Sequence, residues 1–240
     1  MPNDYFQFQQ FRISQGACAQ KVSTDACLLG ATTNLRAATR VLDVGTGTGL
    51  LALMAAQRAP RAFIEAIEID PAAATQAAAN VAASPWPGRV AVHPLSLAAY
   101  AATRPAPFSH IICNPPFFRR SLASPHAART TARHASAQSL TFGELLSFAA
   151  THLAPGGALT VLLPPPEMQQ FAAEARAAGL PERARLAVRH RPGGRLTRCI
   201  SEFGALGPAA VPQSELYVQA EDGGYSPDFQ ALLAGFYLAL

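Results

Sequence analysis

Charged residues are scarce in this chain: they make up 14% of its 240 residues, while half of the chain is apolar. Lysine occurs once, at Lys21, so 18 of the 19 basic residues are arginine. No apolar run reaches the roughly 18 residues that cross a bilayer. The first residues lack the basic and apolar regions of a signal peptide. We therefore expect a cytoplasmic protein without a membrane span.

Cysteine is also scarce, and its placement argues against a metal site. Cys18, Cys27, Cys113 and Cys199 form no CxxC pair, and the six histidines are scattered along the chain. Neither pattern has the ligand spacing of a zinc site. We expect four free, mostly buried thiols and no bound metal. The net charge of +4 and the pI near 9.1 favour a polyanionic partner.

The pattern of apolar residues predicts one α/β domain over residues 1–240, with residues 1–38 as an N-terminal extension. Residues 5–22 alternate apolar and polar and predict a hairpin with a turn at Gln15-Gly16. A helix should follow from the cap at Ser23 to about Leu35. We then expect strands over 41–44, 63–69, 90–92, 108–113, 158–163, 184–190 and 197–203, and helices over 50–57, 71–83, 97–102, 141–152 and 167–178. Such alternation implies a parallel sheet with helices on both faces.

Three alternating glycines, Gly45, Gly47 and Gly49, follow the strand that ends at Asp43-Val44. Glycines in this arrangement let the backbone turn tightly and approach a ligand. The dinucleotide fingerprint GxGxxG fails, because Leu50 stands where its third glycine would be. The loop, which includes Thr46, resembles the S-adenosylmethionine loop of class I methyltransferases. The resemblance implies that Asp43 anchors the loop and helps to receive the ammonium group of the methionine part.

Two further positions are candidates for binding this cofactor. Glu68 ends the next strand, 25 residues after Asp43, and a carboxylate there can accept hydrogen bonds from both ribose hydroxyls. Asp70 is expected to cap the following helix. Relatives often carry an acidic residue after the third strand, where it binds the adenine amino group. Ser96 stands about there in this chain, and its hydroxyl can accept one such bond.

The apolar segment 111–113 ends in Asn114-Pro115-Pro116-Phe117, which resembles the fourth motif of the amino methyltransferases. These enzymes methylate a planar, conjugated nitrogen. The side-chain oxygen of Asn114 and the carbonyl of Pro115 can accept both N–H groups of the amine and draw its nitrogen toward tetrahedral geometry. Phe117 offers a stacking face for a base. Asn114 should also lie beside the cofactor.

The same constellation suits the side-chain amide of glutamine, and release-factor methyltransferases resemble this motif too. Those enzymes usually carry a separate helical domain before the glycine loop, whereas only 42 residues precede Asp43 here. Another RNA, or DNA, is a further possible substrate. An RNA-binding module whose cofactor site has decayed is an alternative from a different class, against which the intact glycine loop and Asn114 argue.

Several further segments resemble the bacterial tRNA1(Val) (adenine(37)-N6)-methyltransferases. These segments are Phe8-Gln9-Gln10-Phe11, Lys21 to Asp25, Leu28-Leu29-Gly30, Ser84-Pro85-Trp86, Ala132-Arg133-His134, Tyr225-Ser226-Pro227 and Phe236-Tyr237-Leu238. The resemblance covers nearly the whole chain. It implies a Rossmann-like class I methyltransferase fold with a mostly parallel seven-stranded sheet, preceded by an N-terminal hairpin and helix.

The family resemblance also implies a reaction and a partner. The reaction is N6-methylation of adenosine 37, beside the anticodon of a valine tRNA, with S-adenosylmethionine as methyl donor. A base in an anticodon loop can be splayed out and stacked on an aromatic ring at modest cost. Basic residues before and after the motif, Lys21, Arg119, Arg133 and Arg198, are candidates for contacts with RNA phosphates.

Overall fold

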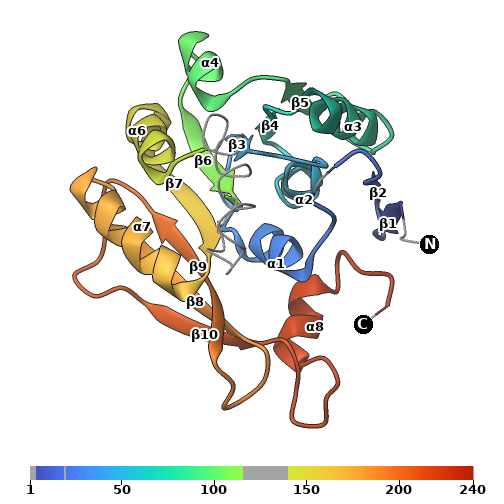
Figure 1. Ribbon diagram of the computed structural model, residues 1–240, viewed down its shortest axis with the longest axis vertical. Coiled ribbons are helices and arrows are strands. Elements are labelled where there is room, and N and C mark those ends of the chain that lie inside the picture. Colours follow the sequence, from blue (N-terminus) through green and yellow to red (C-terminus); the bar gives the residue numbers. More distant parts are fainter. Residues whose placement is uncertain (1–3, 19, 116–139, 240) are drawn as a thin grey trace, which may run out of the picture.

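The structure, a computed structural model, describes residues 4–18, 20–115 and 140–239. In this part of the chain an eight-stranded sheet carries helices on both faces (Figure 1). Its strands are β3 (Arg40–Val44), β4 (Phe63–Ile67), β5 (Val90–His93), β6 (Phe108–Cys113), β7 (Leu153–Leu163), β8 (Glu182–Arg189), β9 (Leu196–Phe203) and β10 (Gln213–Tyr217). The helices are α1 (Thr24–Thr32), α2 (Leu50–Arg58), α3 (Pro71–Ala82), α4 (Leu97–Ala102), α6 (Phe142–His152), α7 (Pro165–Ala177) and α8 (Pro227–Leu233). The expected α/β architecture is confirmed.

The strand order β10-β8-β9-β7-β6-β3-β4-β5 places β3 in the interior of the sheet, between β6 and β4. Every neighbouring pair is parallel except the two pairs that involve β9. The chain runs outward from β3 to β4 and β5 and then returns to β6 on the other side of β3. This reversal creates a topological switch point between β3 and β6, where sheets of this kind bind their ligands.

The sheet has eight strands, so the expected number of seven was wrong. The additional strand β10 lies at the edge and pairs in parallel with β8, with Leu216 opposite Val188. Leu216 is its one buried residue, and the rest of the strand is polar and largely exposed. An edge strand of this composition lacks the apolar alternation that marks a strand in a sequence.

The N-terminal hairpin is present, but its turn lies elsewhere than expected. β1 (Tyr5–Gln7) pairs antiparallel with β2 (Arg12–Ser14), and the chain reverses between them, where the Phe8 N–H donates to the Phe11 carbonyl at 2.9 Å. The hairpin was therefore wrongly predicted to turn at Gln15-Gly16, although Gly16 and Ala17 do form a turn after β2. Gln15 is buried, and its side-chain oxygen accepts from the Val22 N–H at 2.9 Å.

Two element boundaries also differ from the sequence-based expectation. α1 begins after its predicted cap, where the Ser23 hydroxyl accepts from the Ala26 N–H, but it ends at Thr32 rather than near Leu35. β7 begins at Leu153 and runs through the Pro155–Gly157 stretch that was expected to form a turn. The pairing with β6 explains this difference. Phe108 pairs with Leu153 and His110 pairs with Ala158, so the β6–β7 ladder spans residues 154–157 through a register shift.

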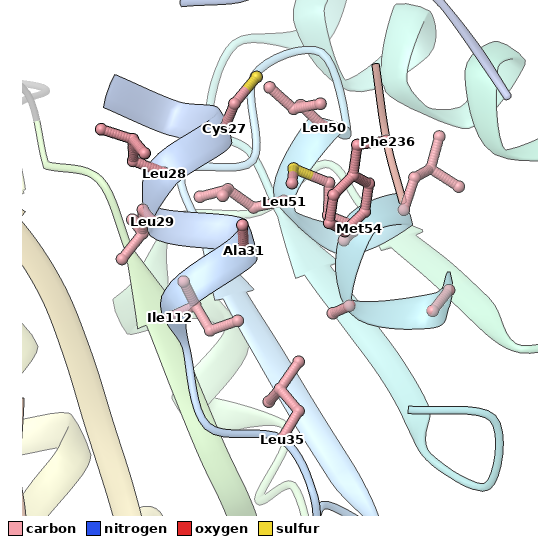
Figure 2. Packing of buried hydrophobic residues seen from close by; sticks show 14 of the residues in the cluster. Cys27, Leu28, Leu29, Ala31, Leu35, Leu50, Leu51, Met54, Ile112 and Phe236 are labelled. Carbon is pink, nitrogen blue, oxygen red and sulfur yellow. The ribbon is translucent and has the colours of Figure 1, made fainter. Parts of the chain in front are cut away.

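The two faces of the sheet bury separate apolar clusters. One cluster combines side chains of α1, α2 and α8, and the other combines those of α4, α6 and α7. Figure 2 shows α1 and α2 side by side, with Leu51 and Met54 of α2 between the two helices. Their close approach depends on Gly30, because a Cβ atom there would lie 2.5 Å from the Met54 sulfur. No helix in the described ranges is both long and apolar enough to cross a membrane.

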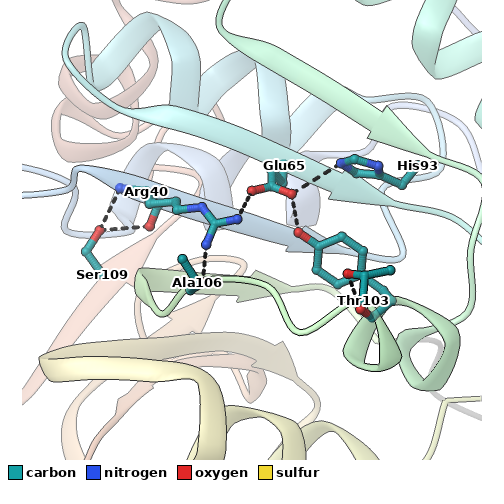
Figure 3. A network of polar contacts seen from close by, with 7 residues as sticks. Arg40, Glu65, His93, Thr103, Ala106 and Ser109 are labelled. Carbon is teal, nitrogen blue, oxygen red and sulfur yellow. Dashed lines mark hydrogen bonds and ion pairs between the residues drawn. The ribbon is translucent and has the colours of Figure 1, made fainter.

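A polar network ties the strands β3, β4 and β5 to α4 (Figure 3). Glu65 accepts from the Arg40 guanidinium and from the Tyr100 hydroxyl, and the His93 ring nitrogen lies 3.2 Å from the same carboxylate. Burial and the Glu65 carboxylate raise the pKa of Tyr100 above its ordinary value. A charged residue inside a sheet is tolerated when partners of this kind surround it.

The Leu29→Ala substitution should lower the free energy of unfolding by about 2–5 kcal/mol, because the side chain is 0% exposed and its loss leaves a cavity between α1 and the sheet. Chemical denaturation followed by circular dichroism measures this change. Leu206→Ala is the matched control, since Leu206 is 80% exposed and should change stability by less than about 0.5 kcal/mol. Equal losses in the two variants would contradict the burial of α1.

Candidate functional site

The ends of three parallel strands lie level with one another at the centre of the sheet. Val44 pairs with Ile67 of β4 on one side and with Cys113 of β6 on the other. Gly45, Glu68 and Asn114 are each the next residue along the chain. The strand register thus brings together three of the residues that the sequence predicts for the site. They stand at the switch point between β3 and β6.

The glycine loop adopts backbone angles that favour glycine. Gly45, Gly47 and Gly49 have positive φ values of 71°, 54° and 84°. The N–H groups of Gly45 and Thr46 both donate to the carbonyl of Ile67 at 3.0 Å, which fixes the start of the loop on β4. A side chain at any of the three glycines would strain this turn.

Asp43 anchors this loop from below, as the sequence predicts. Its carboxylate is fully buried, and Oδ2 accepts from the Thr46 hydroxyl and from the Ala52 N–H in the first turn of α2. Oδ1 is buried without a hydrogen-bond partner among the described residues. Burial raises the pKa of Asp43 to about 7, against the opposing effect of the two hydrogen bonds. The group is thus poised to gain a positively charged partner.

Glu68 stands beside the loop with its carboxylate already oriented. Oε2 accepts from the Gly47 N–H at 2.8 Å, and Oε1 accepts from the Asp70 N–H at 3.0 Å. Each oxygen has a second lone pair, so both can still accept from hydroxyl groups. Asp70 caps α3 as expected, because its side chain accepts from the N–H groups of Ala72 and Ala73.

Ser96 serves as the cap of α4, and its hydroxyl oxygen accepts from the Ala99 N–H at 3.1 Å. This helix cap occupies one acceptor position of the hydroxyl and leaves a second. Its predicted contact with the adenine amino group stays a prediction.

Asn114 emerges from the end of β6 with its side-chain amide set into the protein. Its Oδ1 is buried and has no hydrogen-bond partner among the described residues. A buried acceptor without a partner carries a free-energy cost, which a ligand N–H would remove. Pro115 follows and is buried. Phe117, the predicted stacking ring, lies outside the described residues.

The basic residues expected to contact RNA have different outcomes. Arg119 and Arg133 lie outside the described residues. Lys21 is exposed and has no ion pair in the described ranges. Arg198 makes an ion pair with Asp25 in the first turn of α1, at 2.7 Å. Arg198 therefore fastens β9 to α1, and its role toward RNA stays a prediction.

Two residues near the site were missed by sequence reasoning. Asn80 of α3 is buried and donates to the carbonyl of Thr48 in the glycine loop at 2.9 Å. Cys18 is buried, and its pKa is raised by burial and by the neighbouring carboxylates of Glu68 and Asp70. A polar residue on the buried face of an otherwise alanine-rich helix was the signal for Asn80; the sequence offered no comparable signal for Cys18.

Sequence comparison with known proteins assigns this chain to a family. The methyltransferase small domain model matches residues 17–164. A tRNA1(Val) (adenine(37)-N6)-methyltransferase of Pseudoalteromonas translucida is 39% identical over 235 residues, with 98% of this chain and 99% of that protein covered. One of Dyadobacter fermentans is 38% identical over 239 residues, with 98% of each chain covered. The chain belongs to this methyltransferase family.

Solved structures agree on the fold. A predicted O-methyltransferase of Agrobacterium tumefaciens has a TM-score of 0.63 and 22% identity, with 88% of this chain and 96% of that chain covered. A methyltransferase of Pyrococcus furiosus has a TM-score of 0.54 and 21% identity, with 78% and 85% covered. At such identities the likeness concerns the class I methyltransferase fold alone.

The methyl donor of this family is S-adenosylmethionine, and the described residues fit it. The buried, unpartnered Oδ1 of Asp43 can accept from an ammonium group, and the Glu68 carboxylate can accept from the ribose hydroxyls. All four cysteines are free and buried, as expected. No group of three or more His, Cys, Asp or Glu side chains in the described ranges could hold a metal ion.

Asp43→Asn should weaken the binding of S-adenosylmethionine. It should also abolish the part of the pH dependence of binding that comes from ionisation of the Asp43 carboxyl group. In the free protein Asp43 ionises near pH 7, because burial raises its pKa, and the ionised form is the one that attracts an ammonium group. Wild-type affinity should therefore rise as the pH increases from about 6 to about 8. Isothermal titration calorimetry at several pH values measures the affinity of both proteins. Taking the ratio of the two affinities at each pH cancels the effect of protonation of the ligand itself.

The same pKa shift predicts the pH dependence of folding without ligand. Between the unfolded value of 3.8 and the folded value of about 7, the native protein holds a proton that the unfolded chain has lost. The contribution of Asp43 to stability is thus fully present below about pH 4 and is lost as the pH rises through about 7. For ligand binding, the role of the carboxylate would be contradicted if the affinity of Asp43→Asn for S-adenosylmethionine had the same pH dependence as that of the wild-type protein.

Proposed function

We propose that the protein transfers the methyl group of S-adenosylmethionine to the exocyclic N6 of adenosine 37 in tRNA1(Val). The observation that carries this proposal is the Oδ1 of Asn114 at the switch point, level with the glycine loop, which is buried and has no hydrogen-bond partner in the described part of the chain. Relatives of 38–39% identity that are named tRNA1(Val) (adenine(37)-N6)-methyltransferase align over nearly the whole chain. We also propose a cytoplasmic location, where a tRNA substrate would be available.

The chemical problem of the reaction is the weak nucleophilicity of an exocyclic amine, whose lone pair is delocalised into the ring. Bound S-adenosylmethionine supplies an electrophilic methyl group on its sulfonium sulfur. Asn114 Oδ1 accepts one N–H of the amine, and the carbonyl of Pro115 accepts the other. These two contacts draw the nitrogen toward tetrahedral geometry and expose its lone pair. Because Pro115 has a fixed φ, both acceptors are preorganised.

The position of the site also suits a base from a single-stranded loop. Asn114 stands at the carboxyl edge of the sheet, where the chain leaves β6. A base of the anticodon loop can be splayed out and reach Asn114 at a lower cost than a base that must first be flipped out of a duplex. Phe117 would stack on the base, and Lys21, Arg119, Arg133 and Arg198 would hold phosphates around it.

The deciding experiment is methyl transfer to total tRNA that lacks this modification, followed by nucleoside mass spectrometry and site mapping. We expect N6-methyladenosine at position 37 of a valine tRNA. Parallel reactions with release factor, ribosomal RNA and DNA test the other acceptors of the same motif. Methylation of one of those and not of tRNA would overturn the proposed substrate while retaining the chemistry.

Asn114→Ala should reduce kcat by a factor on the order of 10²–10³, because a preorganised acceptor is lost in the transition state. Binding of S-adenosylmethionine, measured by calorimetry, should change little. Asn34→Ala is the matched control, since Asn34 is an exposed residue in the connection between α1 and β3. A fully active Asn114→Ala enzyme would contradict the assignment of the acceptor.

A further inference from the structure

Asn80 joins the N-terminal hairpin to the glycine loop. Its side chain is 3% exposed and makes three hydrogen bonds, which use both ends of the amide. Nδ2 donates to the carbonyls of Ser14 at 2.8 Å and Thr48 at 2.9 Å, and Oδ1 accepts from the Ser14 N–H at 2.9 Å. One residue of α3 therefore satisfies both backbone groups at the end of β2 and one carbonyl in the loop.

The surrounding helix gives this asparagine a specific setting. α3 is rich in alanine, and asparagine is a poorer helix former than alanine. Ala77, one turn earlier on the same helix, lies against the loop, since a Cβ atom at Gly49 would be 3.4 Å from the Ala77 Cβ. The face of α3 that packs on the glycine loop thus carries small side chains and one buried amide.

Ser14 leads directly into a segment that lies beside the predicted ribose-binding carboxylate. The Gln15 side-chain oxygen accepts from the Val22 N–H. Cys18 is buried, and its burial together with the nearby carboxylates of Glu68 and Asp70 raises its pKa. The hairpin therefore brings residues 15–18 to the edge of the site, and Asn80 holds Ser14, the residue from which this segment starts.

We propose that Asn80 is a positioning residue for S-adenosylmethionine, which holds the end of β2 and the following residues 15–18 against the glycine loop so that this segment forms a wall of the cofactor pocket. The inference rests on the function proposed above. Without the amide, the backbone groups of Ser14 and the carbonyl of Thr48 lose a buried partner. The segment then samples positions in which the pocket is incomplete, and apparent affinity falls with the fraction of competent protein.

The test compares Asn80→Ala and Asn80→Asp with the control Gln9→Ala. Gln9 also fastens the hairpin, through hydrogen bonds to the carbonyls of Ala234 and Tyr237, but within the described ranges its side chain makes no hydrogen bond to the glycine loop. In both Asn80 variants the Kd and KM for S-adenosylmethionine should rise roughly tenfold, while kcat stays within about twofold of the wild-type value. Gln9→Ala should retain the wild-type Kd and KM.

An unchanged Kd in folded Asn80→Ala, or an equal rise in Gln9→Ala, would overturn the inference. Hydrogen exchange in the wild-type protein provides a second test should the variants fail to fold. Addition of S-adenosylmethionine should slow exchange in residues 14–18 together with residues 45–49, and protection confined to 45–49 would overturn the proposal. A wild-type protein that binds no S-adenosylmethionine would instead refute the proposed function, so the two failures are distinguishable.

Discussion

A buried carboxylate at the end of the central strand organises this protein. Asp43 lies beneath the glycine loop and accepts hydrogen bonds from Thr46 in the loop and from Ala52 at the start of α2. Gly49, which precedes α2, has no side chain with which to cap that helix, so Asp43 caps it from the neighbouring strand. Burying this charge is unfavourable, and its raised pKa records the cost. The remaining unpartnered oxygen explains why such a residue suits a cationic ligand.

The parallel register converts this local arrangement into a site. Because β4 and β6 flank β3 and end level with it, the residues that follow all three strands converge. Each strand contributes one kind of chemistry: a flexible backbone at Gly45, a carboxylate at Glu68 and an amide acceptor at Asn114. A shift of one residue in either pairing would turn the adjacent side chains to the other face of the sheet.

The two ends of the chain meet on one side of this core. The ring of Tyr237 lies 5.6 Å from that of Phe6 and 6.0 Å from that of Phe8, and the Gln9 N–H donates to the Phe236 carbonyl at 2.8 Å. The C-terminal residues thus hold the hairpin that Asn80 fastens to the glycine loop. Residues that precede the cofactor loop in sequence thereby become part of its surroundings.

Much of the fold could be read from local patterns. The strand that carries Asp43, the capping of α3 by Asp70 and the capping of α1 by Ser23 are short-range features, and all three were placed correctly. The eighth strand was missed because β10 is polar and needs β8 beside it to form. The hairpin turn was misplaced because Gly16 lies in a turn that follows β2, whereas the reversal between β1 and β2, at residues 8–11, contains no glycine or proline to mark it.

The sequence by itself determined the chemistry of this protein, because the glycine loop and Asn114-Pro115 are contiguous segments whose geometry follows from glycine and proline backbones. Tertiary structure decided which side chains gather around that chemistry. Asn80 binds Ser14 and Thr48 only because α3 crosses both segments, and Arg198 meets Asp25 only because β9 lies beside α1. Such contacts join residues far apart in the chain, and no local pattern encodes them.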